Sequence, residues 1–529
     1  MNDLHANELR VNDLRVVTER LGGSALAALA ITADPRGAAW FAPAPSGADG
    51  WRRRANEVAA RFAGRDWLAA IAPALGPPSA ATARIEAVAR AGGVLVTTGQ
   101  QPGLAGGPLY TLHKALTAQA MAAAIERATG IPAAPLFWAA TDDADIDEAR
   151  RIAIAGPDGV HWLAGPALGA EGDVVWVRPL GDVLAAVDAV VRAAGSAPEQ
   201  VLVRALRESH VADATVGGAY LALLRGFLGP LGIPVLDAFH PALRTAASPH
   251  LRRALERAEA IAAALRERDR DLVAAGFEPQ VREVPGRSLV FSIDGGRKER
   301  IALHEATGAA RQAPADGLAA NVLLRPLLES LLVPTVAYAA GPGEVAYFAQ
   351  VGAVAGALGV SQPLAVPRWS GTIIEPHVAR MMATRGITLP ELADPHAAEA
   401  LRARTLVDPT VLAAFDRIRR AVDQELAIVA AGATREVPAR SVEGTRLLLH
   451  GRADRLERRF LAAAKRTDSE LVRIMTVVRG ALRPGGLRQE RALAWWPFVA
   501  RHGEAVLAQL REATASHAAR LVAGNRDQA

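Results

Sequence analysis

Short apolar runs alternate with helical patterns along residues 92–368, and this alternation predicts an α/β fold. Helical patterns at 108–130 and 250–276 repeat apolar residues every three or four positions. Strand, helix and strand at this spacing predict βαβ units, whose strands are parallel and whose crossovers are right-handed. We therefore expect one doubly wound parallel sheet. Its strands are expected in the apolar runs at 92–99, 132–141, 232–238 and 362–368 and at the start of 333–359, where a glycine turn and a helix follow.

Interruptions of this alternation predict how the chain is organised. Residues 1–90 are typical of short helices and loops rich in Pro, Ala and Gly. From about residue 378 strand patterns stop. We expect a core over 1–377 with inserts at about 150–230 and 277–320, a helical domain over 378–482, and a C-terminal segment, 483–529, that returns to the core.

The helical domain contains two long helical stretches, 408–431 and 443–481. The second has an apolar seam that steps by four and three, slips by one place, and then resumes. This pattern predicts a C-terminal α-helical coiled-coil domain that forms an antiparallel hairpin or a homodimer. An ordinary amphipathic hairpin docked on the core is the alternative. The seam comprises Leu449, Ala453, Leu456, Phe460, Ala463 and Thr467, followed by Leu471, Ile474 and Val478.

Composition and charge narrow the class of protein. The formal net charge of +5 comes from 60 basic and 55 acidic residues, a balance that does not indicate nucleic-acid binding. The absence of cysteine excludes disulfides, thiolate metal sites and a cysteine nucleophile. The first ten residues, MNDLHANELR, lack an apolar core, and no stretch approaches the length of a membrane span. We expect a cytoplasmic protein without membrane contact.

Lysine is rare, which draws attention to the few positions that keep it. Only Lys114, Lys298 and Lys465 occur among the 60 basic residues, and the others are arginine. A lysine that survives such a bias can mark a place that needs a compact ammonium group. Chance survival explains it equally well.

The stretch "LVTTGQQPGLAGGPLYTLHKAL" (95–116) joins a predicted strand to a predicted helix through a glycine-rich loop. Its glycines would let the backbone approach a ligand, and the free N–H groups at the helix start would favour an anion. Lys114 could add a positive charge, and His113 could relay a proton. The spacing matches neither the P-loop nor the dinucleotide-binding fingerprint. The alternative is a tight strand–helix turn with solvated polar residues.

Two further loops follow predicted strands, where ligands bind in a doubly wound sheet. "TDDADIDEAR" (141–150) concentrates carboxylates that could bind Mg²⁺ or a substrate amine, or could simply begin a helix. "AAGPGEVAYFAQ" (339–350) turns at two glycines, and a helix begins there at Glu344. Arg325, upstream, could clamp a carboxylate in bidentate fashion or bridge two elements.

Taken together, these loops resemble those of the bacillithiol-biosynthesis cysteine-adding enzymes. The resemblance runs in order along nearly the whole chain. It is carried by "TTGQQPGLAGGPLYTLHK", "PLFWAATDDADIDEA", "FEPQVREVPGRSLVF", "NVLLRPLLESLLVPTVAYAAGPGEVAYFAQ", "LAVPRWSGTIIE" and "GGLRQERALAWWPFVARHG".

The resemblance implies a Rossmann-like core with connecting inserts and a coiled-coil domain that mediates dimerisation. It also implies an activity, the joining of L-cysteine to glucosaminyl-malate, in which ATP is the expected activator of the carboxyl group. Mg²⁺ is a second candidate cofactor, although no residue is assigned as a metal ligand.

Site residues follow from the loops and the resemblance together. Catalytic roles are expected for His113, Lys114, Asp143 and Asp145. Substrate or nucleotide binding is expected for Gly99, Gln100, Gln101, Gly107, Tyr110, Asp142, Asp147, Glu148, Asn321, Arg325, Gly341, Gly343 and Glu344.

One departure from the family pattern bears on activity. The acidic loop of the family commonly reads Glu-Asp-His-Asp-Phe-Asp-Glu, whereas this chain has Ala144 in place of the histidine. A catalytically altered or inactive dimeric scaffold is therefore an alternative to the enzyme. An RNA-binding relative of the aminoacyl-tRNA synthetases should show a basic stripe, but the arginines of "RADRLERRF" (452–460) are interleaved with acids.

Overall fold

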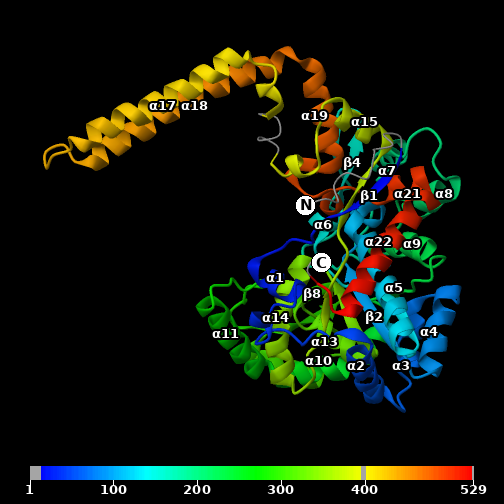
Figure 1. Ribbon diagram of the computed structural model, residues 1–529. Helices are drawn as coiled ribbons and strands as arrows, with labels where there is room; N and C mark the ends of the chain where they lie inside the picture. Colours follow the sequence, from blue (N-terminus) through cyan, green and yellow to red (C-terminus); the bar gives the residue numbers. More distant parts are fainter. Residues whose placement is uncertain (1–12, 395–400, 527–529) are drawn as a thin grey trace. The chain divides into compact units, whose positions relative to one another are not determined.

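The computed structural model describes residues 13–394 and 401–526, and its centre is a five-stranded parallel sheet (Figure 1). The predicted α/β class and all five predicted strands are confirmed. The chain starts the sheet at β2 and adds β3 and β6 on one side of it. It then returns to the other side of β2 and adds β10 and β11, so the direction of winding reverses between β2 and β10. The strands, in sheet order, are β11 (Ala365–Pro367), β10 (Thr335–Ala340), β2 (Val94–Gln100), β3 (Ala133–Ala139) and β6 (Val235–Asp237).

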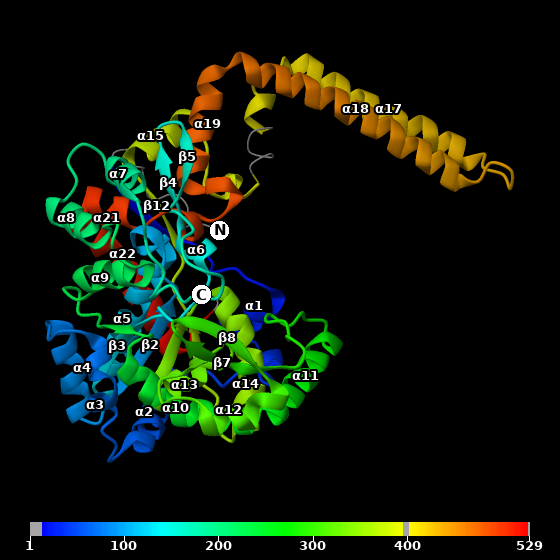
Figure 2. The same ribbon diagram turned by 180° about the vertical axis from the view of Figure 1, so that it is seen from behind.

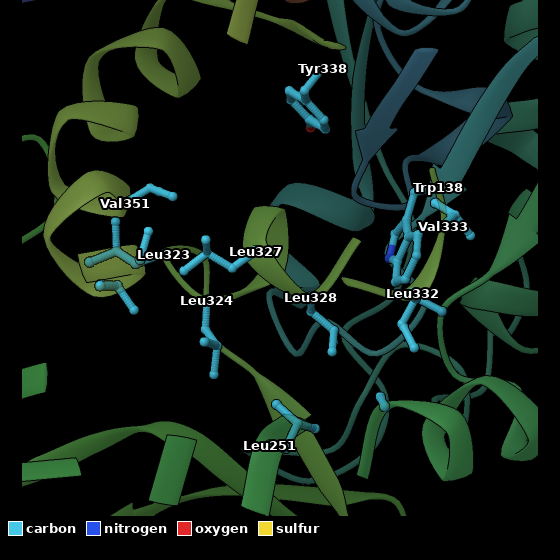
Figure 3. Close-up of a cluster of buried hydrophobic side chains, with 14 of the residues drawn as sticks. Trp138, Leu251, Leu323, Leu324, Leu327, Leu328, Leu332, Val333, Tyr338 and Val351 are labelled. Carbon is cyan, nitrogen blue, oxygen red and sulfur yellow. The ribbon is translucent and has the colours of Figure 1, made fainter. Parts of the chain in front are cut away.

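Both faces of the sheet are covered, which explains why its strands are continuous apolar runs. Val94 and Val96 face a layer formed by α2 (Gly47–Phe62), α5 (Leu109–Thr129) and α22 (Glu504–Ala523). Leu95 faces the opposite layer, which includes α10, α13 and α14. Figure 3 shows part of this second layer, with leucines of α13 near Trp138 and Leu251. The bounds of these helices are α10 (Pro241–Glu256), α13 (Arg325–Leu332) and α14 (Pro342–Leu358).

The long helical pattern at 250–276 is two helices in the structure. α10 ends at Glu256, and α11 (Ala258–Ala274) begins after Arg257, whose φ of −108° and ψ of 17° leave the helical region. Apolar periodicity alone does not reveal such a break, because the residues on both sides of it still face the core.

The two predicted inserts contain their own small sheets. The first has β4 (Arg151–Gly156) paired with β5 (Gly159–Ala164), followed by α7 (Leu184–Ala193), α8 (Gln200–Ser209) and α9 (Val216–Leu228). The second has an antiparallel sheet in the order β8–β7–β9, and α12 (Ala306–Gln312) lies between its last two strands in the chain. Those strands are β7 (Arg287–Asp294), β8 (Arg297–Ala302) and β9 (Leu318–Ala320).

Further elements come from the two ends of the chain and from the segment after β11. β1 (Arg15–Thr18) pairs with β12 (Gly371–Ile374). The early helices are α1 (Ala25–Ile31), α3 (Trp67–Ile71) and α4 (Ala80–Arg90), in addition to α2. Near the C-terminus, α20 (Gln489–Ala492) and α21 (Trp496–His502) lead to α22, which lies along α5 in both views (Figures 1 and 2).

Contacts divide the described chain into two units. The larger comprises 14–154, 162–373 and 490–526, and the smaller comprises residue 13, 155–161, 374–394 and 401–489. The divisions expected at 377/378 and 482/483 stay predictions. Within the described ranges, no helix combines the length and the apolar character needed to cross a bilayer.

The smaller unit contains α15 (Pro376–Thr384), α17 (Pro409–Ala431), α18 (Ala439–Thr467) and α19 (Ser469–Leu482). α17 and α18 lie side by side as an antiparallel hairpin in both views (Figures 1 and 2). Arg419 of α17 donates to Asp454 and Glu457 of α18. The predicted helix over 443–481 breaks at Asp468, which caps α19 by accepting from the Leu471 amide at 2.8 Å.

The slip in the apolar seam therefore marks this break between helices. After the slip, Leu471, Ile474 and Val478 are buried in α19. Before the slip, Leu449 is 39% exposed and Leu456 is 47% exposed, so α17 does not cover this part of the seam.

Candidate active site

A cavity of about 610 Å³ lies in the larger unit, beyond the carboxyl ends of β2 and β10. This is where the winding of the sheet reverses, the usual ligand position in such folds. Thirteen residues that the sequence predicts for the site line it: Gly99, Gln100, Gln101, Tyr110, Lys114, Asp142, Asp143, Asp145, Asn321, Arg325, Gly341, Gly343 and Glu344.

Lys114 is the buried cation at the centre of the cavity's polar wall. It lies in the second turn of α5 with 3% of its surface exposed. Its Nζ donates to the carbonyl oxygen of Gly99 and to Gln100 Oε1, and it lies 2.6 Å from Glu344 Oε2. The three protons of the ammonium group thus have three acceptors, two from the end of β2 and one from the start of α14.

Glu344 connects Lys114 to Arg325. Its Oε2 also accepts from the Gly341 amide at 2.7 Å, and its Oε1 accepts from the Tyr338 hydroxyl at 2.7 Å. Arg325 Nη2 lies 3.7 Å from Glu344 Oε1 and donates to the Tyr347 hydroxyl at 3.3 Å. The carboxylate therefore holds together the two turns that meet at the switch point.

Burial and the neighbouring charges shift the pKa values of Lys114 and Glu344 in opposite directions. Burial lowers the pKa of Lys114, and Glu344 acts in the opposite direction without cancelling it. Burial raises the pKa of Glu344, but Lys114 and Arg325 together outweigh burial and leave that pKa below its ordinary value. The carboxylate form of Glu344 is therefore favoured, and it lies 2.6 Å from the amino group of Lys114 in surroundings where charge interacts strongly.

The acidic loop is organised by its own hydrogen bonds and by one glutamine. Asp143 Oδ1 accepts from the Ala144 amide at 2.6 Å, and Asp145 Oδ1 accepts from the Glu148 amide at 3.0 Å. Gln101 Nε2 donates to Asp143 Oδ2. The alternative prediction for this loop, that its acids simply begin a helix, is met by α6 (Ile146–Ala149). Asp143 and Asp145 nevertheless also line the cavity.

Four residues predicted for the site do not line the cavity: His113, Gly107, Asp147 and Glu148. Asp147 pairs with Arg150 at 2.9 Å on the surface. Glu148 accepts from the Tyr110 hydroxyl at 3.2 Å, and burial raises its pKa.

Gly107 lies outside the cavity because the start of α5 is covered by the C-terminal segment. The Leu109 amide donates to the Leu493 carbonyl at 2.9 Å, and Trp495 Nε1 donates to the Gly106 carbonyl at 3.0 Å. Gly107 has a φ of +82°, so it supplies a left-handed turn that other residues adopt with strain. The loop is a packed turn, and the first amide of the helix start expected to bind an anion already donates to Leu493.

His113 lies on α5 next to Lys114 but points into a buried network. Its Nδ1 donates to Glu490 Oε2 at 3.0 Å, and its ring meets Trp369 edge-on with the centroids 4.7 Å apart. Burial lowers its pKa. Glu490 also accepts from Arg368 Nη1 and Nη2 at 2.9 and 2.7 Å and from Ser370 Oγ at 3.0 Å.

This network fixes Arg368, which lines the cavity where His113 does not. Burial raises the pKa of Glu490, but Arg368 and His113 outweigh burial and hold that pKa well below its ordinary value. His113 thus reaches the cavity only through Glu490 and Arg368.

Several cavity residues are missing from the sequence-based assignment. The rarity of lysine pointed to Lys298, and two of the arginines lie in the quoted stretch "FEPQVREVPGRSLVF", but neither signal identified a cavity wall. Arg368 and Arg491 also lie in quoted stretches, "LAVPRWSGTIIE" and "GGLRQERALAWWPFVARHG", but neither was assigned to the site. The residues missed include Arg282, Arg287, Phe291, Lys298, Arg300, Tyr347, Arg368 and Arg491.

The carboxylates of the cavity decide whether Mg²⁺ could bind there. In the part of the chain that the structure describes, no three His, Cys, Asp or Glu side chains are grouped closely enough to hold a metal ion by themselves. Mg²⁺ is commonly held by one or two carboxylates together with substrate phosphates. Asp142 and Asp145 fit that role, since both line the cavity.

Glu329 is a buried acid of α13 that the site leaves without a hydrogen bond. Neither carboxylate oxygen has a hydrogen-bond partner in the described structure, and the nearest cation is Arg325, whose Nε lies 3.9 Å from Oε1. Burial raises the pKa of Glu329 to about 7, although Arg325 acts against it. The core thus contains a carboxyl group that titrates near neutral pH.

We expect Glu329→Gln to stabilise the protein above pH 7 by about 2 kcal/mol. In the wild type, a folded-state pKa near 7 against about 4.3 when unfolded makes stability fall as the pH rises between those values. Glutamine has no proton to lose, so its stability should not fall there. Urea denaturation at pH 5 and pH 8 measures the difference. The exposed Glu259→Gln variant serves as the control, and equal pH slopes for wild type and Glu329→Gln would contradict the expectation.

The fold and the cavity define a class: a Rossmann-like α/β protein with a polar cavity at the switch point and a separate helical unit. Residues 18–369 match the family described as "Bacillithiol biosynthesis BshC, N-terminal Rossmann-like domain". The chain belongs to the BshC family.

Relatives resemble the chain over most of its length. One from Solibacter usitatus is 31% identical over 460 residues, which cover 81% of this chain and 83% of the relative. One from Koribacter versatilis is 32% identical over 454 residues, with the same coverage. One from Symbiobacterium thermophilum is 28% identical over 522 residues, 89% of this chain and 93% of the relative. Each bears the name "Putative cysteine ligase BshC".

Proposed function

We propose that this protein is an amide-forming ligase that joins L-cysteine to glucosaminyl-malate in bacillithiol biosynthesis, with ATP as the activator. The names of its relatives support cysteine ligation, and the family description supports the biosynthetic role. The observation that carries the proposal is the charged group of Lys114, Glu344 and Arg325 in a cavity at the switch point.

The reaction joins two groups that do not combine unaided. A carboxylate is a poor electrophile, and ATP would supply the leaving group that makes the cysteine carboxyl reactive. The amine of glucosaminyl-malate then attacks that carboxyl, the leaving group departs, and one proton leaves the amine. The chain must therefore stabilise negative charge near the carboxyl and accept a proton near the amine.

The two charged sides of the cavity suit these two tasks. Lys114 and Arg325 can stabilise negative charge on the activated carboxyl and its leaving group. Asp142, Asp143 and Asp145 lie in the acidic loop and can bind an ammonium group and receive a proton from the amine. Tyr347, beside Arg325, helps to fix the guanidinium.

A ligation assay with ATP, L-cysteine and glucosaminyl-malate tests the proposal. The Ala144→His variant, assayed in parallel, tests whether position 144 takes part in the chemistry. Ala144 lies between two cavity-lining aspartates, and its amide donates to Asp143 Oδ1. A histidine there would be surrounded by carboxylates that raise its pKa and favour a protonated ring. We expect the substitution to raise activity about tenfold or more, or to create it where the wild type has none.

A magnesium titration of both proteins completes the assay. Without the histidine, the acids repel one another unless a cation lies among them, so wild-type activity should depend more strongly on Mg²⁺. Strong wild-type activity unimproved by Ala144→His would remove position 144 from the chemistry. Inactivity of both proteins would favour the scaffold alternative or another substrate pair.

We further propose that the protein is a homodimer through the helical hairpin. Leu449 and Leu456 belong to the apolar seam on α18, and they remain 39% and 47% exposed, whereas Phe460 further along the seam packs against Phe415 of α17. Exposed apolar side chains spaced by heptads are typical of helix pairing between chains.

We expect wild type to be a dimer by light scattering and the Leu449→Glu, Leu456→Glu double variant to be a monomer. Charges in an apolar seam must be desolvated when it is paired, which disfavours association. Ala462→Glu is the control, because Ala462 is exposed on a different face of the same helix. A double variant that remains dimeric would place the interface elsewhere.

A further inference from the structure

The second insert contributes a strongly basic wall to the cavity. Four of its cations line the cavity: Arg282, Arg287, Lys298 and Arg300. Strand β8 explains the arrangement, since alternate residues of a strand face opposite sides. Lys298 and Arg300 share the face toward the cavity, whereas Arg297 and Glu299 share the other face and pair with each other at 2.8 Å. The outer face is thus neutralised by its own acid.

The cavity face is not neutralised in this way. In the described structure Arg287 and Arg300 have no carboxylate within ion-pair distance, and Arg287 Nη1 donates instead to the Arg300 carbonyl at 3.0 Å. Burial lowers the pKa of Arg300, and the neighbouring charge of Arg287 lowers it further. Two like charges that stand together without a counter-ion gain free energy when an anion binds between them.

The ring of Phe291 contacts two cations of the same wall. Arg300 Cζ lies 4.7 Å and Lys298 Nζ 4.8 Å from the centroid of Phe291 on the paired strand β7. Contact with a ring face fixes both cations and removes water from one side of each. Lys298 also donates to the Asp142 carbonyl at 2.9 Å, so it links the basic wall to the acidic loop.

The acids that line this part of the cavity are engaged with other groups. Glu283 accepts from Arg266 at 3.0 Å, and Asp269 accepts from Gln350 at 2.9 Å. Asp142 Oδ2 lies 3.6 Å from Lys298 Nζ. In the described structure Arg287 and Arg300 therefore have no carboxylate partner, and neither does the exposed Arg282 in the loop before β7.

We propose that Arg287 and Arg300 form a binding site for a doubly charged anionic group of a substrate, separate from the Lys114 group in the same cavity. The assignment rests on the proposed function for the identity of the substrate, and two sources supply this chemistry. One is the pair of carboxylates in the malate part of the acceptor, and the other is the phosphate chain of ATP. Guanidinium groups bind both carboxylate and phosphate in bidentate fashion.

Full-length Arg287→Gln and Arg300→Gln variants test the site by steady-state kinetics, with the acceptor and ATP varied separately. We expect KM for one of the two substrates to rise about 10- to 100-fold, because a lost charged hydrogen bond has that effect on affinity, while kcat changes little. A rise confined to the acceptor assigns the site to its carboxylates. A rise confined to ATP assigns it to the phosphates.

Two sets of variants control for charge and for folding. Arg297→Gln removes a charge from the outer face of the same strand and should leave both KM values unchanged. Arg287→Lys and Arg300→Lys keep the charge but lose the planar fork, so they should show intermediate KM values. They also keep the test decisive if a glutamine variant fails to fold.

Calorimetric binding of glucosaminyl-malate alone and ATP alone separates this proposal from the proposed function. Weaker binding of either probe to the arginine variants supports the anion site even in a protein that shows no ligation. Unchanged affinity for both probes, or a wild-type protein that binds neither, overturns it.

Discussion

Lys114→Arg is expected to lower kcat/KM for cysteine ligation by about a hundredfold or more. The ammonium of Lys114 is buried and reaches Gly99, Gln100 and Glu344 at once. A guanidinium is larger and planar, so it cannot meet these three acceptors without moving the end of β2 or the start of α14. Those two turns hold the residues that would surround the reacting carboxyl, and small displacements there reduce rate steeply.

Lys298→Arg is the matched control, since it makes the same substitution at another lysine that lines the cavity. The side chain of Lys298 is 10% exposed and its Nζ contacts acceptors of Asp142 alone, which a guanidinium can also reach, so activity should change by less than about tenfold. Wild-type turnover in Lys114→Arg would remove Lys114 from the catalytic residues. Equal losses in both variants would indicate that the cavity tolerates no arginine at either place.

Glu490→Gln is expected to destabilise the protein by about 3–5 kcal/mol, the largest stability effect of any single substitution considered. The carboxylate and the Arg368 side chain it binds are each 2% exposed. Glutamine keeps the shape but removes the charge, which leaves the guanidinium buried without a counter-ion. One of the two carboxylate oxygens becomes an NH2 group, so either His113 or Ser370 also loses its acceptor on this side chain.

Urea denaturation measures this loss, and its pH dependence gives an independent check. The pKa of Glu490 is depressed in the folded state, so the stability it supplies is complete above about pH 4.3 and declines as the pH falls further. The glutamine variant should lack that decline. Glu504→Gln, which breaks an exposed pair with Arg511, is the control and should cost less than about 1 kcal/mol. A loss of stability as small as this in Glu490→Gln would show that the hydrogen-bond network of Glu490 and Arg368 does not stabilise the fold as expected.

The parts of the fold that the sequence predicts are those with a local signal. The strands are covered on both faces, so they appear as continuous apolar runs, and glycine turns follow β2 and β10 directly. The loops that supply Lys114 and Glu344 could be identified for the same reason, because parallel strands bring their carboxyl ends to one edge. The pairing of these two residues follows from that geometry.

Other features depend on contacts between distant segments, which no local pattern records. His113 sits beside Lys114 in the sequence, but successive helix positions point about 100° apart, so one side chain reaches the cavity and the other reaches Glu490. Glu490 and Arg368 lie in two of the stretches that carry the family resemblance, but nothing in either stretch indicates that these two side chains meet. The basic wall comes from an insert in which no strand was predicted, and the pairing of β8 with β7 decides which of its side chains meet the cavity.

The order of strands has a consequence for synthesis on the ribosome. β2 is the first strand of the five to be made, yet it ends up in the middle of the sheet, and its neighbour β10 begins only at Thr335. At the usual rate of synthesis, the edge of β2 that β10 will cover stays open for about 10 to 50 seconds. An apolar strand with an open edge is a template for pairing with other chains. Slower translation between residues 100 and 335 should therefore increase aggregation of the nascent chain, whereas slower translation after residue 370 should not.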